Sequence, residues 1–205
     1  MRRFLVIALL GLGGACTLPR DAIDSSQPPA IAAEPARTII DSILPPDEEM
    51  RRFRADGGPP RDSLSGGASS REQLVRAFLA ALAAHDTVTI RSLVMGRLEF
   101  ADLYYPASQF ARPPYRSPLG LVWTQIQLNS EKGIVRATRR LGGQRIAYVA
   151  ADCPAAPERF GSARLHNGCR VRYVTSTGDT AARRLFGPII EVAGRWKFVS
   201  YANDM

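Results

Sequence analysis

Proline is unevenly distributed along this chain, and its distribution sets where regular structure can form. Eight of the fifteen prolines in the 205 residues stand between residues 17 and 68. Because proline interrupts the hydrogen bonding of helix interiors and central strands, we predict that residues 16–68 form a disordered tether. One stretch inside it, residues 47–56, has acids before arginines and is followed by two glycines, which favours a short helix. That helix could pack on the domain or on a partner, or it could fray.

The first fifteen residues have the layout of a secretory signal. A positive start precedes an apolar run over residues 4–12 and small residues before Cys16. This end resembles the bacterial lipobox, although Gly13 stands where that motif has a large aliphatic residue. The resemblance implies that residues 1–15 are removed, and that acylated Cys16 holds the protein to a membrane of the cell envelope. Thr17, in place of an aspartate, favours the periplasmic face of the outer membrane. The alternative is ordinary cleavage that leaves Cys16 as a free thiol.

Charge is divided between the tether and the rest of the chain. The formal net charge is +8, and residues 71–205 hold 19 basic against 10 acidic side chains. A basic domain favours anionic partners such as lipid head groups or envelope polyanions. The arginines do not alternate with aromatic residues, and an exported chain rarely meets nucleic acid, so we expect no nucleic-acid partner. Two histidines and three cysteines are too few for the usual zinc clusters, and we expect neither metal nor cofactor.

Residues 69–205 begin with helical patterns and end with strand patterns. Ser69 and Glu72 form a predicted capping box for a helix that runs to about Ala84. A short helix over 87–95 follows, and Pro118 begins a long helix that Gly142 ends. The period then changes to two, which predicts four strands at 145–151, 170–177, 182–192 and 195–201, with a kink at Gly187-Pro188. This order predicts an α+β domain with N-terminal helices packed on a four-stranded antiparallel sheet.

Two stretches of this domain resemble a known superfamily. Phe78-Leu-Ala-Ala-Leu-Ala-Ala-His-Asp86 is similar to the first helix of nuclear transport factor 2-like (SnoaL-like) proteins, and Gly194-Arg-Trp-Lys-Phe-Val-Ser-Tyr201 is similar to their last strand. The resemblance implies that residues 69–205 form a cone, in which a curved four-stranded sheet surrounds a helix and leaves a pocket at the open end. Members of this superfamily include isomerases, cyclases and non-enzymatic binding modules, so the fold alone selects no function.

The two cysteines of the domain stand at the ends of neighbouring predicted strands. Cys153 follows the first strand and Cys169 precedes the second, so antiparallel pairing would place them opposite each other. Export favours oxidation, and we therefore predict a Cys153–Cys169 disulfide rather than two buried thiols. We expect the residues between them to form a long loop, with His166 in solvent.

The chain carries few candidates for catalysis. Asp102 and Glu99 are the acids that could line a pocket, together with Tyr104 and Tyr105; the alternative is that both are ordinary surface acids. Phe78 stands where the ketosteroid isomerase pattern has a tyrosine, so the resemblance supplies no oxyanion donor.

These observations lead to three hypotheses about function. The first is an envelope-anchored, non-enzymatic lipoprotein that binds a small apolar or anionic ligand or an envelope protein. The second is a cyclase- or isomerase-like enzyme that uses a pocket carboxylate, Asp102 or Glu99. The third is an assembly accessory, whose residues 47–54 dock on another envelope protein.

Overall fold

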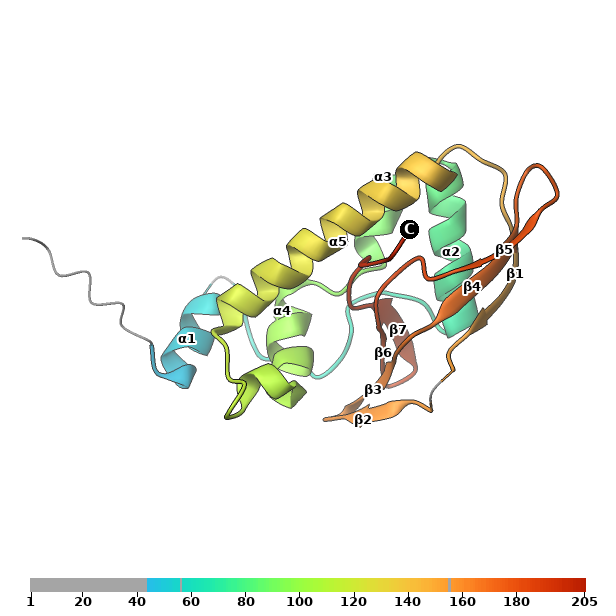
Figure 1. The fold of residues 1–205 in the computed structure, drawn as a ribbon. Coiled ribbons are helices and arrows are strands. Elements are labelled where there is room, and N and C mark those ends of the chain that lie inside the picture. The colour runs from blue at the N-terminus through green and yellow to red at the C-terminus, as the bar shows by residue number, and fades with distance from the viewer. Residues whose placement is uncertain (1–43, 56, 155) are drawn as a thin grey trace, which may run out of the picture. The chain divides into compact units, whose positions relative to one another are not determined.

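The computed structural model describes residues 44–55, 57–154 and 156–205, which belong to one compact unit. The predicted signal, the acylated Cys16 and most of the tether lie outside the described residues. The described helices come first along the chain and the strands last (Figure 1). The predicted α+β class is therefore confirmed.

The helices begin where local capping favours them. The helices are α1 (Pro46–Phe53), α2 (Arg71–Ala83), α3 (Thr87–Ser92), α4 (Arg97–Glu99) and α5 (Leu119–Leu141). Ser70, one residue after the predicted cap, accepts a hydrogen bond from the backbone N–H of Gln73 at 3.1 Å, and Asp86 caps α3 in the same way. After α4 the chain makes a π-helical turn, η1 (Phe100–Tyr104), and two 3₁₀ turns, η2 (Tyr105–Ala107) and η3 (Gln109–Ala111).

The strands form two antiparallel sheets rather than the single curved four-stranded sheet that we expected. One sheet has the order β1 (Ala147–Asp152), β4 (Arg170–Val174), β5 (Thr180–Arg183). The other has the order β2 (Glu158–Phe160), β3 (Ala163–His166), β6 (Ile189–Val192), β7 (Arg195–Phe198).

The break between the two sheets has a local cause. Strands β3 and β4 follow each other along the chain, as do β5 and β6, and each pair is interrupted where the sheet changes. Gly168, with φ +67°, lies in the first interruption and Gly187-Pro188 in the second. A positive φ and a proline without an N–H cannot continue a ladder. The interruption predicted at Gly187-Pro188 is a complete break, which divides the single kinked strand that we expected over 182–192 between the two sheets.

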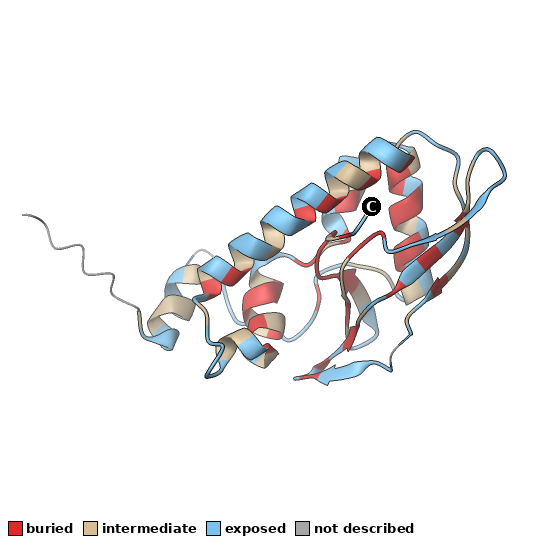
Figure 2. Ribbon diagram, viewed as in Figure 1, coloured by how far each residue is buried: buried red, intermediate tan, exposed pale blue. Residues whose placement is uncertain are grey.

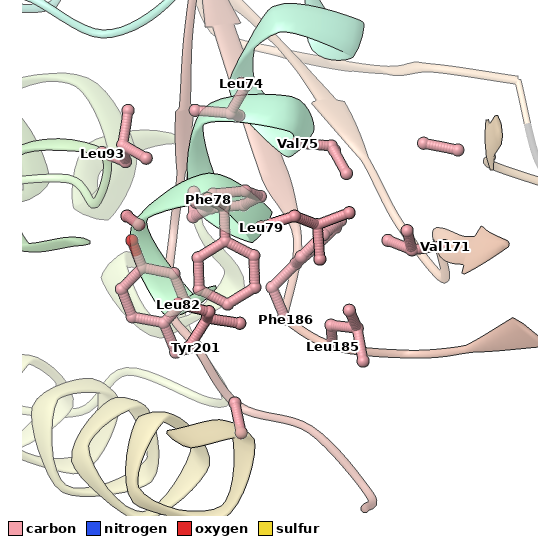
Figure 3. Packing of buried hydrophobic residues seen from close by; sticks show 14 of the residues in the cluster. Leu74, Val75, Phe78, Leu79, Leu82, Leu93, Val171, Leu185, Phe186 and Tyr201 are labelled. Atoms are coloured by element: carbon pink, nitrogen blue, oxygen red, sulfur yellow. The ribbon is translucent and has the colours of Figure 1, made fainter. Parts of the chain in front are cut away.

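Two aromatic-rich clusters form the core on either side of β6 and β7. The first contains α2 and the β1–β4–β5 sheet, and its centre is Phe78, whose ring stacks on Tyr201 at 5.0 Å (Figure 3). The second surrounds Phe100 and receives Ile190 from β6. Phe78 is completely buried among other rings, so the position where the superfamily resemblance suggested a pocket residue is core.

Helix α5 spans the described unit and contacts α1 and α2 (Figure 1). It lies against the C-terminal segment, where the side-chain amide of Asn203 donates to the Gly133 carbonyl at 2.9 Å. A Cβ at Gly133 would overlap the carbonyl oxygen of Tyr201, so only glycine permits this approach. None of the described helices is long and apolar enough to cross a membrane.

Helix α1 begins one residue before the predicted 47–56 stretch, ends inside it, and packs on the domain. Phe53 stands 6.1 Å from Phe100 and 6.4 Å, edge-on, from Trp123, between ring centroids. The Arg97 guanidinium lies 4.3 Å above the Phe53 ring. At the exposed side of α1, hydrogen bonds from arginines 51 and 52 lower the pKa of Glu48 to about 2. Of the alternatives left open for this helix, packing on its own domain is the one observed.

Residues 57–68, which we call the strap, connect α1 to α2 along the domain surface. Leu64 is buried, and Ala68 exchanges two backbone hydrogen bonds with Trp196 of β7 at 3.0 and 2.9 Å. The boundary expected between tether and domain, at residue 68, therefore falls inside the compact unit.

The Cys153–Cys169 disulfide is confirmed. Asp152 pairs with Arg170 in the register of β1 and β4, and the two cysteines stand one step beyond that pair with their Cα atoms 4.0 Å apart. The residues between them are not the long loop that we expected, because they include the β2–β3 hairpin.

Opening this disulfide should destabilise the domain. A cross-link between residues 16 apart restricts the unfolded chain, and chain-entropy estimates give about 3 kcal/mol for a loop of this size. We expect Cys153→Ser/Cys169→Ser to lower the free energy of unfolding by about 2–4 kcal/mol in urea titrations. Ser162→Ala, at an exposed position between the two cysteines, leaves the cross-link intact and serves as the control. A loss no larger than that of the control would contradict this assignment.

Candidate functional site

Glu99, one of the two acids proposed from the sequence, is buried in an ion pair with Lys197 of β7. Its side chain is 3% exposed and that of Lys197 is 7% exposed. The Lys197 ammonium donates to both carboxylate oxygens at 3.0 Å. Glu99 also accepts from the backbone N–H of Ser65 at 2.6 Å and from that of Gly96, at the start of α4, at 2.7 Å. The carboxylate therefore joins three segments: α4, β7 and the strap.

Asp102, one turn later, holds the other end of the strap. It accepts from the backbone N–H of Arg61 at 2.8 Å, and its other oxygen lies 2.9 Å from Nε of Arg54. The Arg54 contact is an ion pair without hydrogen-bond alignment, because Nε has no bonded partner among the described residues. The side chains of both candidate acids are thus largely buried and already hydrogen-bonded. Each of them holds a backbone segment that precedes α2.

A pocket of about 260 Å³ opens beside the Glu99–Lys197 pair. Arg61 and Ser65 of the strap line it together with Arg97, Glu99 and Lys197. Its lining carries three positive charges and one negative charge. An ammonium has three N–H donors, of which Glu99 accepts two, and no described residue accepts the third. The pocket therefore combines excess positive charge with an available buried donor.

Tyr104 and Tyr105 do not join this pocket. The Tyr105 hydroxyl donates to the Ser117 carbonyl at 2.8 Å, and the Tyr104 ring packs 5.0 Å from Phe160. Burial raises the pKa of both phenols, and for Tyr104 the charge of Glu158 adds to the effect. The four side chains expected at one mouth consequently do not converge.

His166 was expected in solvent and is instead buried. It lies on β3, where its Nε2 is 3.3 Å from a Glu191 carboxylate oxygen and its ring is 4.7 Å from that of Trp196. The expectation was wrong because the segment is a strand rather than a loop. The described residues hold no cluster of three or more metal-ligating side chains.

Sequence reasoning missed Lys197, Arg61 and Arg97. One signal for Lys197 was present, since it is one of only two lysines in the chain and stands in an apolar strand between Trp196 and Phe198. A lysine in such a strand needs a partner if its face is buried. No comparable signal marked the two arginines, and Arg61 in addition lies in the strap, which was assigned to the tether.

Comparisons with known proteins add no identification. No family model, no curated protein and no solved structure matches the chain. The assignment of a function therefore rests on the residues and geometry described above.

Breaking the buried ion pair should cost far more than breaking an exposed one. Lys197→Met leaves the Glu99 carboxylate buried without its counter-ion, at a cost of about 3–5 kcal/mol. We expect Glu99→Gln/Lys197→Met to be at least about 2 kcal/mol more stable than the sum of the single changes predicts, measured as free energies of unfolding in urea.

The exposed pair Glu72–Arg76 on α2 is the matched control for this cycle. The corresponding variants, Glu72→Gln and Arg76→Met, should show a coupling of about 0.5 kcal/mol or less. Equal coupling energies for the two pairs would contradict the structural role given to Glu99 and Lys197.

Proposed function

We propose that this chain is an exported lipoprotein of the cell envelope. In this proposal residues 1–15 are removed, acylated Cys16 holds the protein at the periplasmic face of the outer membrane, and a proline-rich tether leads to the domain. The layout of residues 1–16 supports the proposal, and the Cys153–Cys169 disulfide suits an oxidising compartment.

We also propose that the domain is related to the nuclear transport factor 2-like superfamily. The support is the order of helices before interrupted, antiparallel strands.

We further propose that the domain is a non-catalytic binding module for a small oxyanion, or for the anionic end of a larger ligand. The observation that carries this proposal is the convergence of Arg61, Arg97 and Lys197 on one pocket that holds a single carboxylate. Guanidinium and ammonium groups are the side chains that hold phosphate and carboxylate most strongly. The volume of about 260 Å³ is below that of pockets for drug-sized ligands, which favours a small group.

Catalysis by Glu99 or Asp102 has less support. A general base must reach the proton that it removes. Glu99 accepts four hydrogen bonds from Lys197, Ser65 and Gly96, so its oxygens are already occupied. Asp102 is occupied by Arg54 and by the strap and does not line the pocket.

Phosphate binding should depend on Arg61, whose exposed side chain can be changed without loss of an ion pair in the described structure. We expect calorimetric titration with inorganic phosphate to show one saturable site, and Arg61→Gln to weaken it tenfold or more, as loss of a charge-assisted contact would. Acetate titrations, at matched ionic strength, decide whether carboxylate is preferred.

The control for that titration is Arg112→Gln, an exposed arginine outside the pocket, which should leave phosphate affinity unchanged. Both variants should unfold at the temperature of the parent protein. Equal weakening by the two variants, or no saturable binding at all, would contradict the proposed site.

Acylation should depend on Cys16. In a bacterial host fed a palmitate analogue, we expect the full chain to carry the label and to sediment with membranes, and Cys16→Ala to lose both properties. An unlabelled parent protein in the soluble fraction would show that the envelope anchor is wrong.

A further inference from the structure

The outer side of α5 carries an apolar stripe. Leu121, Leu128 and Val135 are 59%, 49% and 46% exposed, and their spacing of seven places them on the same side of the helix. The opposite side is buried and contains Leu119 and Ala137. Figure 2 shows exposed and buried residues alternating along the whole length of α5. The stripe extends for about 21 Å, at 1.5 Å per residue.

Two hollows flank this stripe. The first, of about 430 Å³, is lined by Phe110 and by Leu121, Val122 and Ile126 of the N-terminal half of α5. The second, of about 360 Å³, lies between α3 and the C-terminal half of α5, where Ile90, Ile134 and Val135 line it. Leu121, at one end of the stripe, borders the first hollow, and Val135, at the other end, borders the second. A bound element that lies along the stripe can therefore place a side chain at the mouth of each hollow.

The charges beside the stripe are mostly positive. Arg91 and Arg139 line the second hollow, and Lys132 and Glu131 lie on the intervening turn. None of these four side chains forms an ion pair within the part of the chain that the structure describes. Three available cations against one acid favour an occupant with negative charge.

We propose that α5 binds an amphipathic helix of another protein, whose apolar side covers the stripe and enters the two hollows and whose flanking residues are acidic. A helix with apolar residues three and four positions apart presents the knobs that such hollows accept. This surface is separate from the oxyanion pocket, so the inference goes beyond the function proposed above.

Two other occupants fit the surface less well. A second copy of this chain would bring together two basic domains, each with 19 basic against 10 acidic side chains over residues 71–205, which is repulsive. A bilayer favours a broad apolar helix face, whereas the stripe of α5 is one residue wide and polar side chains such as Gln125 and Lys132 interrupt it. The hollows would also remain unfilled against a flat surface.

Photo-crosslinking of the full, anchored chain in its native cells tests this inference. A photoreactive amino acid replaces Leu128 and, as a matched control, Val149, which is 48% exposed on β1. We expect one protein adduct from position 128 at fivefold or higher yield over position 149. Mass spectrometry should place the crosslink in a helical, amphipathic segment with net negative charge.

Charge reversal separates the proposed recognition from chance contact. Lys132→Glu/Arg139→Glu should reduce the adduct at position 128 at least fivefold, whereas Arg183→Glu/Arg195→Glu, at exposed positions on β5 and β7, should not. An adduct with a second copy of this chain, with lipid or with a basic segment would overturn the proposal. A yield at position 128 no higher than at position 149, or one unchanged by Lys132→Glu/Arg139→Glu, would overturn it as well. Phosphate affinity should be unaffected by these changes, so a negative crosslinking result would not contradict the proposed oxyanion pocket.

Discussion

A buried ion pair between Glu99 and Lys197 is the interaction on which this domain most depends. Neither charge could be buried alone, because removing an ion from water costs several kcal/mol. Together, with the backbone N–H groups of Ser65 and Gly96, they satisfy one carboxylate completely. The pair therefore joins the first turn of α4, the last strand and the strap at a single point. Asp102 and its partners repeat this arrangement one turn further along.

The same interaction explains why two acids that suggest catalysis from sequence do not act as free bases. Their oxygens bind the strap, and the strap in turn contributes Arg61 and Ser65 to the pocket wall. Glu99 neutralises only one of three nearby cations, so the pocket keeps its positive character. A structural ion pair and a proposed binding site thus share the same residues, and the strap that follows α1 completes both.

Periodicity and composition predicted much of the fold. The apolar positions of α2, the long α5 and the kink at Gly187-Pro188 follow from local signals, and so does the facing of Cys153 and Cys169. The division into two sheets does not follow from local signals, because it depends on whether neighbouring strands are interrupted at positions that lie side by side in the sheet. The short β2 and β3 lie among prolines and glycines and have too few residues to show an alternation. His166 was misplaced for this reason.

The candidate site was only half predictable. Glu99 and Asp102 could be named as acids beside aromatic residues, but apart from Gly96 their partners are 34 to 98 residues distant in sequence. The proline-rich sequence of the strap is typical of a tether. The structure shows instead that Leu64 is buried and that Ala68 pairs with Trp196. Long-range pairing of this kind carries no local pattern, because the strap is ordered by the domain and not by its own propensity.

Nuclear magnetic resonance of the lysine ammonium groups can show whether Lys197 is held in a buried ion pair beside a phosphate-binding pocket. The chain has two lysines, so the exposed Lys132 provides an internal reference for the buried Lys197. We expect the Lys197 ammonium protons to be protected from exchange with water and to shift on addition of phosphate but not of chloride, while Lys132 responds to neither. A Lys197 signal that exchanges as fast as that of Lys132, or that does not change on addition of phosphate, would contradict this expectation.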